Sequence, residues 1–172
     1  MRPLTETCPK PLLQVGGKPL VEHLLDVIPP EISELIVVVG YLEDQIKSFL
    51  GNHWRGRPVN YVLQPIKRGT ADALFLCKPF LKKEEQFLVL YADDLHGSAT
   101  VADCVALGKS CLSVVRVDNP HKFGVVVIDK NRKINPRPKY KGQSIWESQS
   151  ISFCRLKKAI KSDINLLKRG LE

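Results

Sequence analysis

Two short stretches of this 172-residue chain carry side chains whose types and spacing could do chemistry. In "QPIKRGTADAL", Gln64 is followed by Gly69 and Thr70. In "LYADDLH", Asp93 and Asp94 follow an apolar run. The first stretch holds groups suited to a planar, hydrogen-bonding ligand, and the second holds oxygen ligands suited to a hard cation.

The side-chain amide of Gln64 offers one donor group and one acceptor, which suits the imide edge of a pyrimidine base. Gly69 lacks a side chain, so the backbone there can approach a planar ring. We include the neighbouring Thr70 among the nucleotide-binding candidates. A structural interpretation explains the same residues equally well, with Gln64 ending a strand, Thr70 capping a helix and Asp72 in its first turn. The sequence leaves both interpretations open.

Two carboxylates at the end of a buried apolar strand are costly unless they are solvated, paired or bound to a cation. Mg²⁺ bound together with substrate phosphates prefers oxygen ligands of this kind, so we expect a Mg²⁺ site at this aspartate pair. The alternative is an aspartate pair that caps the next turn. We interpret His96 as a loop residue, because imidazole is a poor ligand for Mg²⁺.

Short apolar, β-branched runs alternate with helical patterns along the chain. Strands are expected at 34–40, 59–64, 86–93, 111–117 and 123–129, and helices at 20–28, 43–50, 70–76 and 100–107. This alternation predicts an α/β fold with a mainly parallel sheet and helices on both faces, because parallel neighbours need crossover connections. Ligands of open α/β sheets bind beyond the carboxyl ends of the strands, where Gln64 and Asp93 are expected.

Four stretches in this order resemble the sugar-1-phosphate nucleotidyltransferases: "MRPLTETCPKPLLQVGGKPLVEHLL", "QPIKRGTADAL", "FLVLYADD" and "NPHKFGVVVID". The resemblance covers residues 1–134, and we expect one nucleotidyltransferase-like domain over 1–172. It implies a Rossmann-like fold. It also implies transfer of a nucleotidyl group from an NTP, with UTP or dTTP favoured, to a sugar 1-phosphate, giving an NDP-sugar and pyrophosphate.

The resemblance implies roles for individual residues. Lys10, in "CPKP", matches the lysine that reaches the phosphates at the reacting centre, and is the expected catalytic residue. Gln64 and Gly69 match the residues that read the base. Asp93 matches the carboxylate that holds the catalytic Mg²⁺, and Gly124 matches a glycine whose backbone faces the sugar.

Some family features have no match in this chain. In the family, a first strand and a glycine-rich loop precede the counterpart of "MRPLT", and a later aspartate completes the metal site. We therefore expect a gap in the sheet, filled by a partner chain or a shifted segment, and little or no turnover by the chain as given. The alternative function is a truncated, catalytically impaired relative that acts as a nucleotide- or partner-binding module.

Lys and Arg outnumber Asp and Glu by 26 to 18, so the net charge is +8 and anionic partners are expected. No helix-turn-helix or aromatic-interleaved basic motif favours nucleic acid, and no run of about 18 apolar residues favours a membrane. We predict a cytoplasmic protein with small-molecule substrates and reduced cysteines. Homo-oligomerisation is left open. We interpret the basic stretch 155–169 as a solvated helix face.

Overall fold

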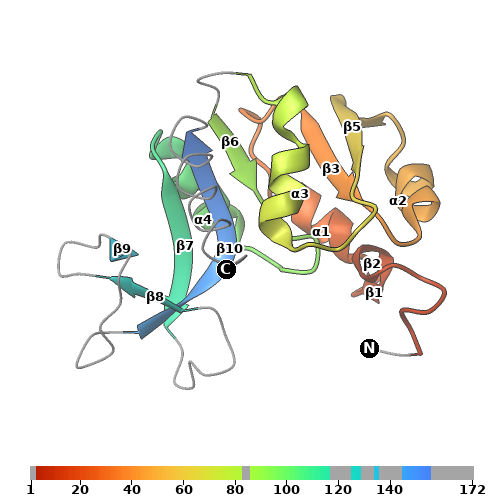
Figure 1. The fold of residues 1–172 in the computed structure, drawn as a ribbon, viewed down its shortest axis with the longest axis horizontal. Coiled ribbons are helices and arrows are strands. Elements are labelled where there is room, and N and C mark those ends of the chain that lie inside the picture. The colour runs from red at the N-terminus through yellow and green to blue at the C-terminus, as the bar shows by residue number, and fades with distance from the viewer. Residues whose placement is uncertain (1–2, 83–85, 117–124, 129–133, 136–144, 156–172) are drawn as a thin grey trace.

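The fold was analysed in a computed structural model, which describes residues 3–82, 86–116, 125–128, 134–135 and 145–155 (Figure 1). Its helices are α1 (Leu20–Asp26), α2 (Glu43–Leu50), α3 (Thr70–Leu76) and α4 (Ser98–Ala106), with 3₁₀ turns η1 (Lys10–Leu12) and η2 (Lys78–Phe80). All four expected helices are therefore present. Within the described residues, no helix is long and apolar enough to cross a membrane.

A parallel pair of strands forms the first sheet. β3 (Leu35–Val39) pairs with β5 (Arg57–Leu63), α2 is the crossover between them, and β4 (His53–Trp54) pairs antiparallel with the start of β5. Val39 lies opposite Leu63, and the backbone N–H of Gln64 donates to the carbonyl oxygen of Val39 at 2.8 Å. The chain therefore leaves β3 and β5 at the same edge of the sheet.

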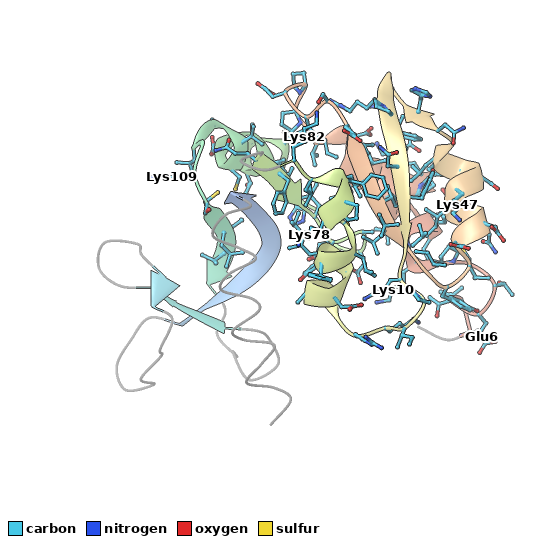
Figure 2. The ribbon with its side chains drawn as sticks, turned by 45° about the horizontal axis from the view of Figure 1, so that its top comes forward. Glu6, Lys10, Lys47, Lys78, Lys82 and Lys109 are labelled. Atoms are coloured by element: carbon cyan, nitrogen blue, oxygen red, sulfur yellow. The ribbon has the colours of Figure 1, made fainter. Side chains whose placement is uncertain are left out.

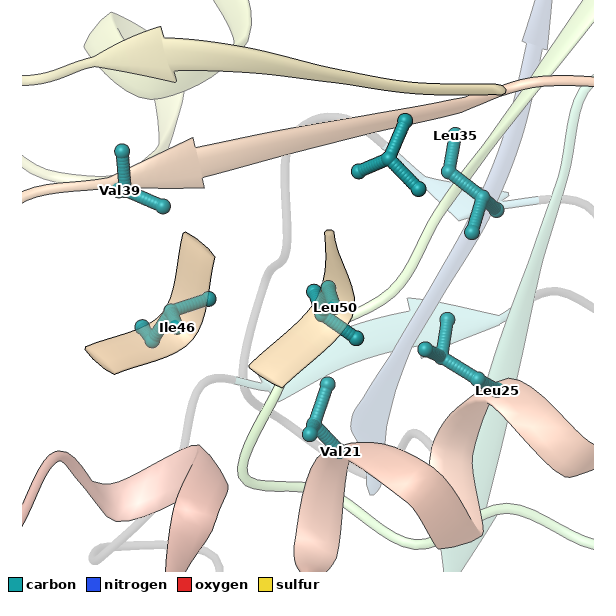
Figure 3. Packing of buried hydrophobic residues seen from close by; sticks show 7 residues of the cluster. Val21, Leu25, Leu35, Val39, Ile46 and Leu50 are labelled. Carbon is teal, nitrogen blue, oxygen red and sulfur yellow. The ribbon is translucent and has the colours of Figure 1, made fainter. Parts of the chain in front are cut away.

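One apolar cluster joins α1 and α2 to these two strands (Figure 3). Along α2, Ile46 and Leu50 are four residues apart and lie on one face of the helix. Along β3, Leu35 and Val39 share one face of the strand by alternation. The buried members of the cluster are Val21, Leu25, Leu35, Val39, Ile46, Leu50 and Val59. This core fixes the strands whose carboxyl ends lead into the candidate site.

The second sheet is built around one long strand. Its members are β6 (Gln86–Val89), β7 (Cys111–Arg116), β8 (Val125–Ile128), β9 (Ile134–Asn135) and β10 (Ile145–Arg155). β10 pairs antiparallel with β7 along one edge and with β6 and β8 in turn along the other, and β9 pairs with β8. The expected α/β, Rossmann-like class is confirmed. The expectation of mainly parallel pairing holds for β3 and β5, whereas this sheet is antiparallel because β10 runs between β6 and β7.

β3 and β6 belong to separate sheets. Among the described strands, β3 pairs only with β5, and β6 pairs only with β10. Side chains connect the end of α1 to β6 instead, because Val27, which follows α1, packs with Leu88 of β6 against Val101 and Cys104 of α4. The described strands therefore form separate sheets, and no backbone pairing joins β3 to β6.

The stretch "VGGKPL" forms a hairpin between β1 (Gln14–Val15) and β2 (Lys18–Pro19). Gly16 and Gly17 have φ angles of 58° and 88°, which tight hairpin turns require and glycine adopts readily. Because α1 begins directly after β2, the glycine pair acts as a turn before a helix.

Candidate active site at the carboxyl ends of the strands

The segment before η1 is fixed to residues that follow β3. The hydroxyl of Tyr41 donates to the carbonyl oxygen of Glu6 at 2.6 Å. The side-chain amide of Gln45 donates to the carbonyl oxygen of Thr7 at 2.9 Å. These bonds hold the chain just before Lys10 at the carboxyl end of β3. Sequence reasoning missed both donors, because an exposed tyrosine and an exposed glutamine at a helix start carry no distinctive pattern.

Lys10 and Asp93 form an ion pair at this edge. The Nζ atom of Lys10 lies 3.2 Å from Oδ2 of Asp93, and the two side chains are 49% and 48% exposed. Lys10, labelled in Figure 2, is the first residue of η1, and Asp93 lies in the turn after β6. An exposed pair of this kind contributes about 0–1 kcal/mol. A ligand that offers each partner a stronger interaction can therefore separate them.

Asp93 presents a half-exposed carboxylate at the aspartate pair where the sequence predicts Mg²⁺. Within the part of the chain that the structure describes, no three His, Cys, Asp or Glu side chains gather into a metal-binding group. Mg²⁺ keeps several waters and is commonly held by one or two carboxylates together with substrate phosphates. The donor set at Asp93 therefore fits a Mg²⁺ ion shared with a nucleotide, and it does not fit an all-protein metal site.

His96 lies farther along the same loop. Both of its ring nitrogens are buried, and neither has a hydrogen-bond partner in the described structure. This burial lowers the pKa of His96, an effect that the nearby carboxylate of Asp94 opposes. Burial disfavours the charged imidazolium and therefore favours the neutral ring.

Two hydrogen bonds hold the side-chain amide of Gln64, which follows β5 directly. Its Nε2 atom donates to the carbonyl oxygen of Gly69 at 3.1 Å and to Oδ2 of Asp72 at 2.9 Å. An amide NH₂ has two hydrogens, so both are used. Among the described residues, none donates a hydrogen bond to Oε1. From the sequence, both the donor and the acceptor of the Gln64 amide are expected to bind a ligand. In the folded chain, the donor Nε2 is already bonded, and only the acceptor Oε1 remains available to a ligand.

Gly69 is the N-cap of α3, and Thr70 is the first residue of the helix. The φ angle of Gly69 is 96°, a conformation that residues with a side chain rarely adopt. No described atom lies within 4 Å of the position that a Cβ would occupy there. Backbone conformation, rather than crowding, therefore favours glycine. The cap is Gly69 and not Thr70, contrary to the structural alternative.

The structure thus brings Lys10 and Asp93 into contact and places Gln64 beside the carboxyl end of β3. The sequence pattern indicates only an acidic residue in the first turn of a helix at Asp72, whereas in the structure Asp72 is a direct partner of Gln64. One sequence signal could have indicated this contact: Asp72 comes three residues after Gly69 and eight residues after Gln64, the amide at the end of a strand. Gly124, expected to face the sugar, lies outside the described residues.

Comparisons with known proteins identify the family of the chain. Residues 1–136 match the family model described as nucleotidyl transferase. The chain is 31% identical over 134 residues to the bifunctional protein GlmU of Methanococcus maripaludis, an alignment covering 78% of this chain and 31% of GlmU. It is 33% identical over 106 residues to the UTP–glucose-1-phosphate uridylyltransferase AglF of Haloferax volcanii, covering 61% of this chain and 42% of AglF.

A solved structure extends the agreement to three dimensions. The structure of a Bacillus anthracis protein assigned as a glucose-1-phosphate thymidylyltransferase, in complex with sucrose, has a TM-score of 0.75 and 25% identity. The match covers 90% of this chain and 66% of that protein. The chain spans about a third of the length of the GlmU relatives that it matches. With the family model matched from residue 1 to 136 and the fold shared with a solved structure, the chain belongs to the nucleotidyl transferase family.

Proposed function

We propose that this chain transfers a nucleotidyl group from an NTP, with UTP or dTTP favoured, to a sugar 1-phosphate and releases pyrophosphate. The contact between Lys10 and Asp93, 83 positions apart in the sequence, is the observation that carries the proposal. It joins the residue expected at the phosphates to the residue expected at the metal. The uridylyltransferase and thymidylyltransferase names of two relatives support the choice of reaction and of base.

Nucleotidyl transfer depends on positioning and charge neutralisation more than on a general base. An oxygen of the sugar 1-phosphate attacks the α-phosphorus in line, the bond from that phosphorus to the bridging oxygen of the β-phosphate breaks, and pyrophosphate leaves. The ammonium of Lys10 would neutralise negative charge on the phosphates. Asp93 would hold Mg²⁺, which supplies further positive charge when bound. Gln64 would orient the base.

The free structure keeps the two charged groups of this site close together and accessible. Separating the exposed pair costs about 0–1 kcal/mol. A hydrogen bond to a charged group contributes about 1.5–3 kcal/mol, so contacts with phosphates can outweigh the pair. We therefore assign Lys10 and Asp93 to the phosphate end of one ligand and Gln64 to its base end.

The test is product formation by the 172-residue chain. It is incubated with Mg²⁺, each common NTP and a panel of hexose 1-phosphates, and NDP-sugar and pyrophosphate are quantified by mass spectrometry. Because little turnover is expected of the chain as given, NDP-sugar should form only slowly, with UTP or dTTP, and Lys10→Ala and Asp93→Asn should abolish its formation. Lys109→Ala is the matched control, since Lys109 is an exposed lysine on the opposite side of the molecule from Lys10 (Figure 2).

One outcome distinguishes catalysis from nucleotide binding alone, and another tests the assignment of the site residues. If no NDP-sugar forms in long incubations while NTP binding is measurable, the catalytic proposal is wrong and the nucleotide-binding module is favoured. If Lys10→Ala forms product as fast as the Lys109→Ala control, the site is assigned to the wrong residues.

A further inference from the structure

We propose that Asp72 is a positioning residue, which fixes the side-chain amide of Gln64 so that Oε1 accepts a hydrogen bond from a ring N–H of the bound base. The inference rests on the proposed function, because it concerns the base end of the same site. It defines the preferred bases as those with a hydrogen on the ring nitrogen of the pairing edge. Uracil, thymine and guanine have this hydrogen, whereas cytosine and adenine have a lone pair there.

The placement of Gln64 is determined first by the sheet. Its backbone N–H is bonded to Val39 across the parallel pair, so the position of its Cα is set by β3 and β5. Only the side-chain torsions and the orientation of the amide remain to be fixed. Asp72, in the first turn of α3, lies within hydrogen-bond distance of that amide.

The chemistry of the two partners decides which way the amide faces. The carbonyl oxygen of Gly69 and Oδ2 of Asp72 are both acceptors, at 3.1 and 2.9 Å from Nε2. A flipped amide would set Oε1 against these two oxygens and lose both hydrogen bonds. The partners therefore assign the nitrogen to this side and leave Oε1 for a ligand.

Of the two partners, Asp72 has the larger influence. A hydrogen bond to an ionised acceptor is roughly twice as strong as one between neutral groups. Gly69 contributes a neutral backbone oxygen, which any residue at that position would also supply. The carboxylate of Asp72 is thus the part of the arrangement that a side-chain substitution can remove.

Uracil and cytosine provide the sharpest comparison, because the two bases have the same size and differ at the pairing edge. The N3–H of uracil can donate to Oε1, whereas the lone pair on N3 of cytosine would face another acceptor. Leaving buried polar groups unpaired costs about 1–3 kcal/mol, which corresponds to about 5- to 150-fold in affinity. We therefore expect the parent chain to bind UTP at least about fivefold more tightly than CTP.

The experiment measures Kd for UTP and CTP with Mg²⁺ by calorimetry in the parent chain and three variants. Asp72→Ala should bring the UTP to CTP ratio close to one, because the amide can then turn either face to the base. Asp72→Asn keeps an acceptor oxygen at the same place and should retain most of the ratio. Asp44→Ala removes an acidic residue from the first turn of α2 and should keep the parent ratio.

Side-chain amide NMR gives a readout without nucleotide. The Nε2 protons of Gln64 should exchange with solvent more slowly in the parent chain than in Asp72→Ala, and circular dichroism checks that the variant is folded. Failure to bind any NTP would overturn the proposed function and this inference with it. Measurable NTP binding with equal affinity for UTP and CTP in the parent, or a ratio unchanged by Asp72→Ala, would overturn the role of Asp72 alone.

Discussion

The ammonium nitrogen of Lys10 lies 3.2 Å from a carboxylate oxygen of Asp93 in the folded chain. Lys10 begins η1, Asp93 follows β6, and the segment between them forms α1, β3, α2, β5 and α3. The parallel strands and their helices therefore bring a cation and an anion from distant parts of the sequence together at one edge. The site depends on this whole scaffold.

The first prediction concerns the metal at Asp93. In an Mn²⁺ titration followed by electron paramagnetic resonance, the parent chain should bind the ion weakly alone and more tightly with UTP, because the ion shares phosphate oxygens. Asp93→Asn should lose the nucleotide-dependent part, and Asp103→Asn, an exposed helix aspartate, should keep it. Identical titrations for the parent and Asp93→Asn would show that Asp93 is only a turn residue.

The second prediction concerns the core beneath the site. Leu50 is 3% exposed and packs with residues of α1, β3 and β5. Leu50→Ala should lower the free energy of unfolding by about 2–5 kcal/mol, measured by urea denaturation, because it leaves a cavity. Leu107, which is 51% exposed, provides the control, and Leu107→Ala should change the value by about 0.5 kcal/mol or less. Equal losses in the two variants would contradict the core described above.

The third prediction concerns pH. The pKa of His96 is lowered from 6.5 by burial, so between that lowered value and 6.5 the unfolded chain binds a proton that the folded chain does not. The free energy of unfolding therefore rises with pH in this window, and the stability is lost as pH falls below about 6.5.

Urea denaturation at several pH values tests this sign. His96→Gln should flatten the dependence of the free energy of unfolding on pH just below 6.5, where His96 contributes. His53→Gln, which changes an exposed histidine of β4, should leave the dependence unchanged. A parent chain whose stability falls as pH rises through this window would contradict the burial of His96.

The helices and the first sheet could be predicted from the sequence, because their apolar residues recur with helical spacing or in short continuous runs. β3 and β5 appear close to their expected bounds for this reason. β10 was missed, since "IWESQSISFCR" is rich in polar residues, and its strand form depends on pairing with β6, β7 and β8. Such long-range pairing leaves little local signal.

The sequence could predict that the site residues lie beyond the ends of strands, but it could not predict their detailed geometry. β6 ends at Val89 rather than at the expected residue 93, and Asp93 lies in a turn where the N–H of Asp94 donates to the carbonyl oxygen of Tyr91 at 3.2 Å. The orientation of the Gln64 amide could not be predicted, because it depends on Asp72, which bonds to it only once α3 has formed next to the end of β5.

The central claim is that one nucleotide spans Gln64 and Lys10, with the base at the first residue and the phosphates at the second. The most direct test is calorimetric Kd values for UTP, dTTP and ATP with Mg²⁺ in the parent chain, Gln64→Ala and Lys10→Ala. We predict that Gln64→Ala narrows the preference for UTP and dTTP over ATP by about 1–3 kcal/mol, the discrimination typical of a paired contact to a base edge. Lys10→Ala should weaken all three nucleotides by the same factor. An equal loss of all three nucleotides in Gln64→Ala, or a base-selective loss in Lys10→Ala, would contradict the account.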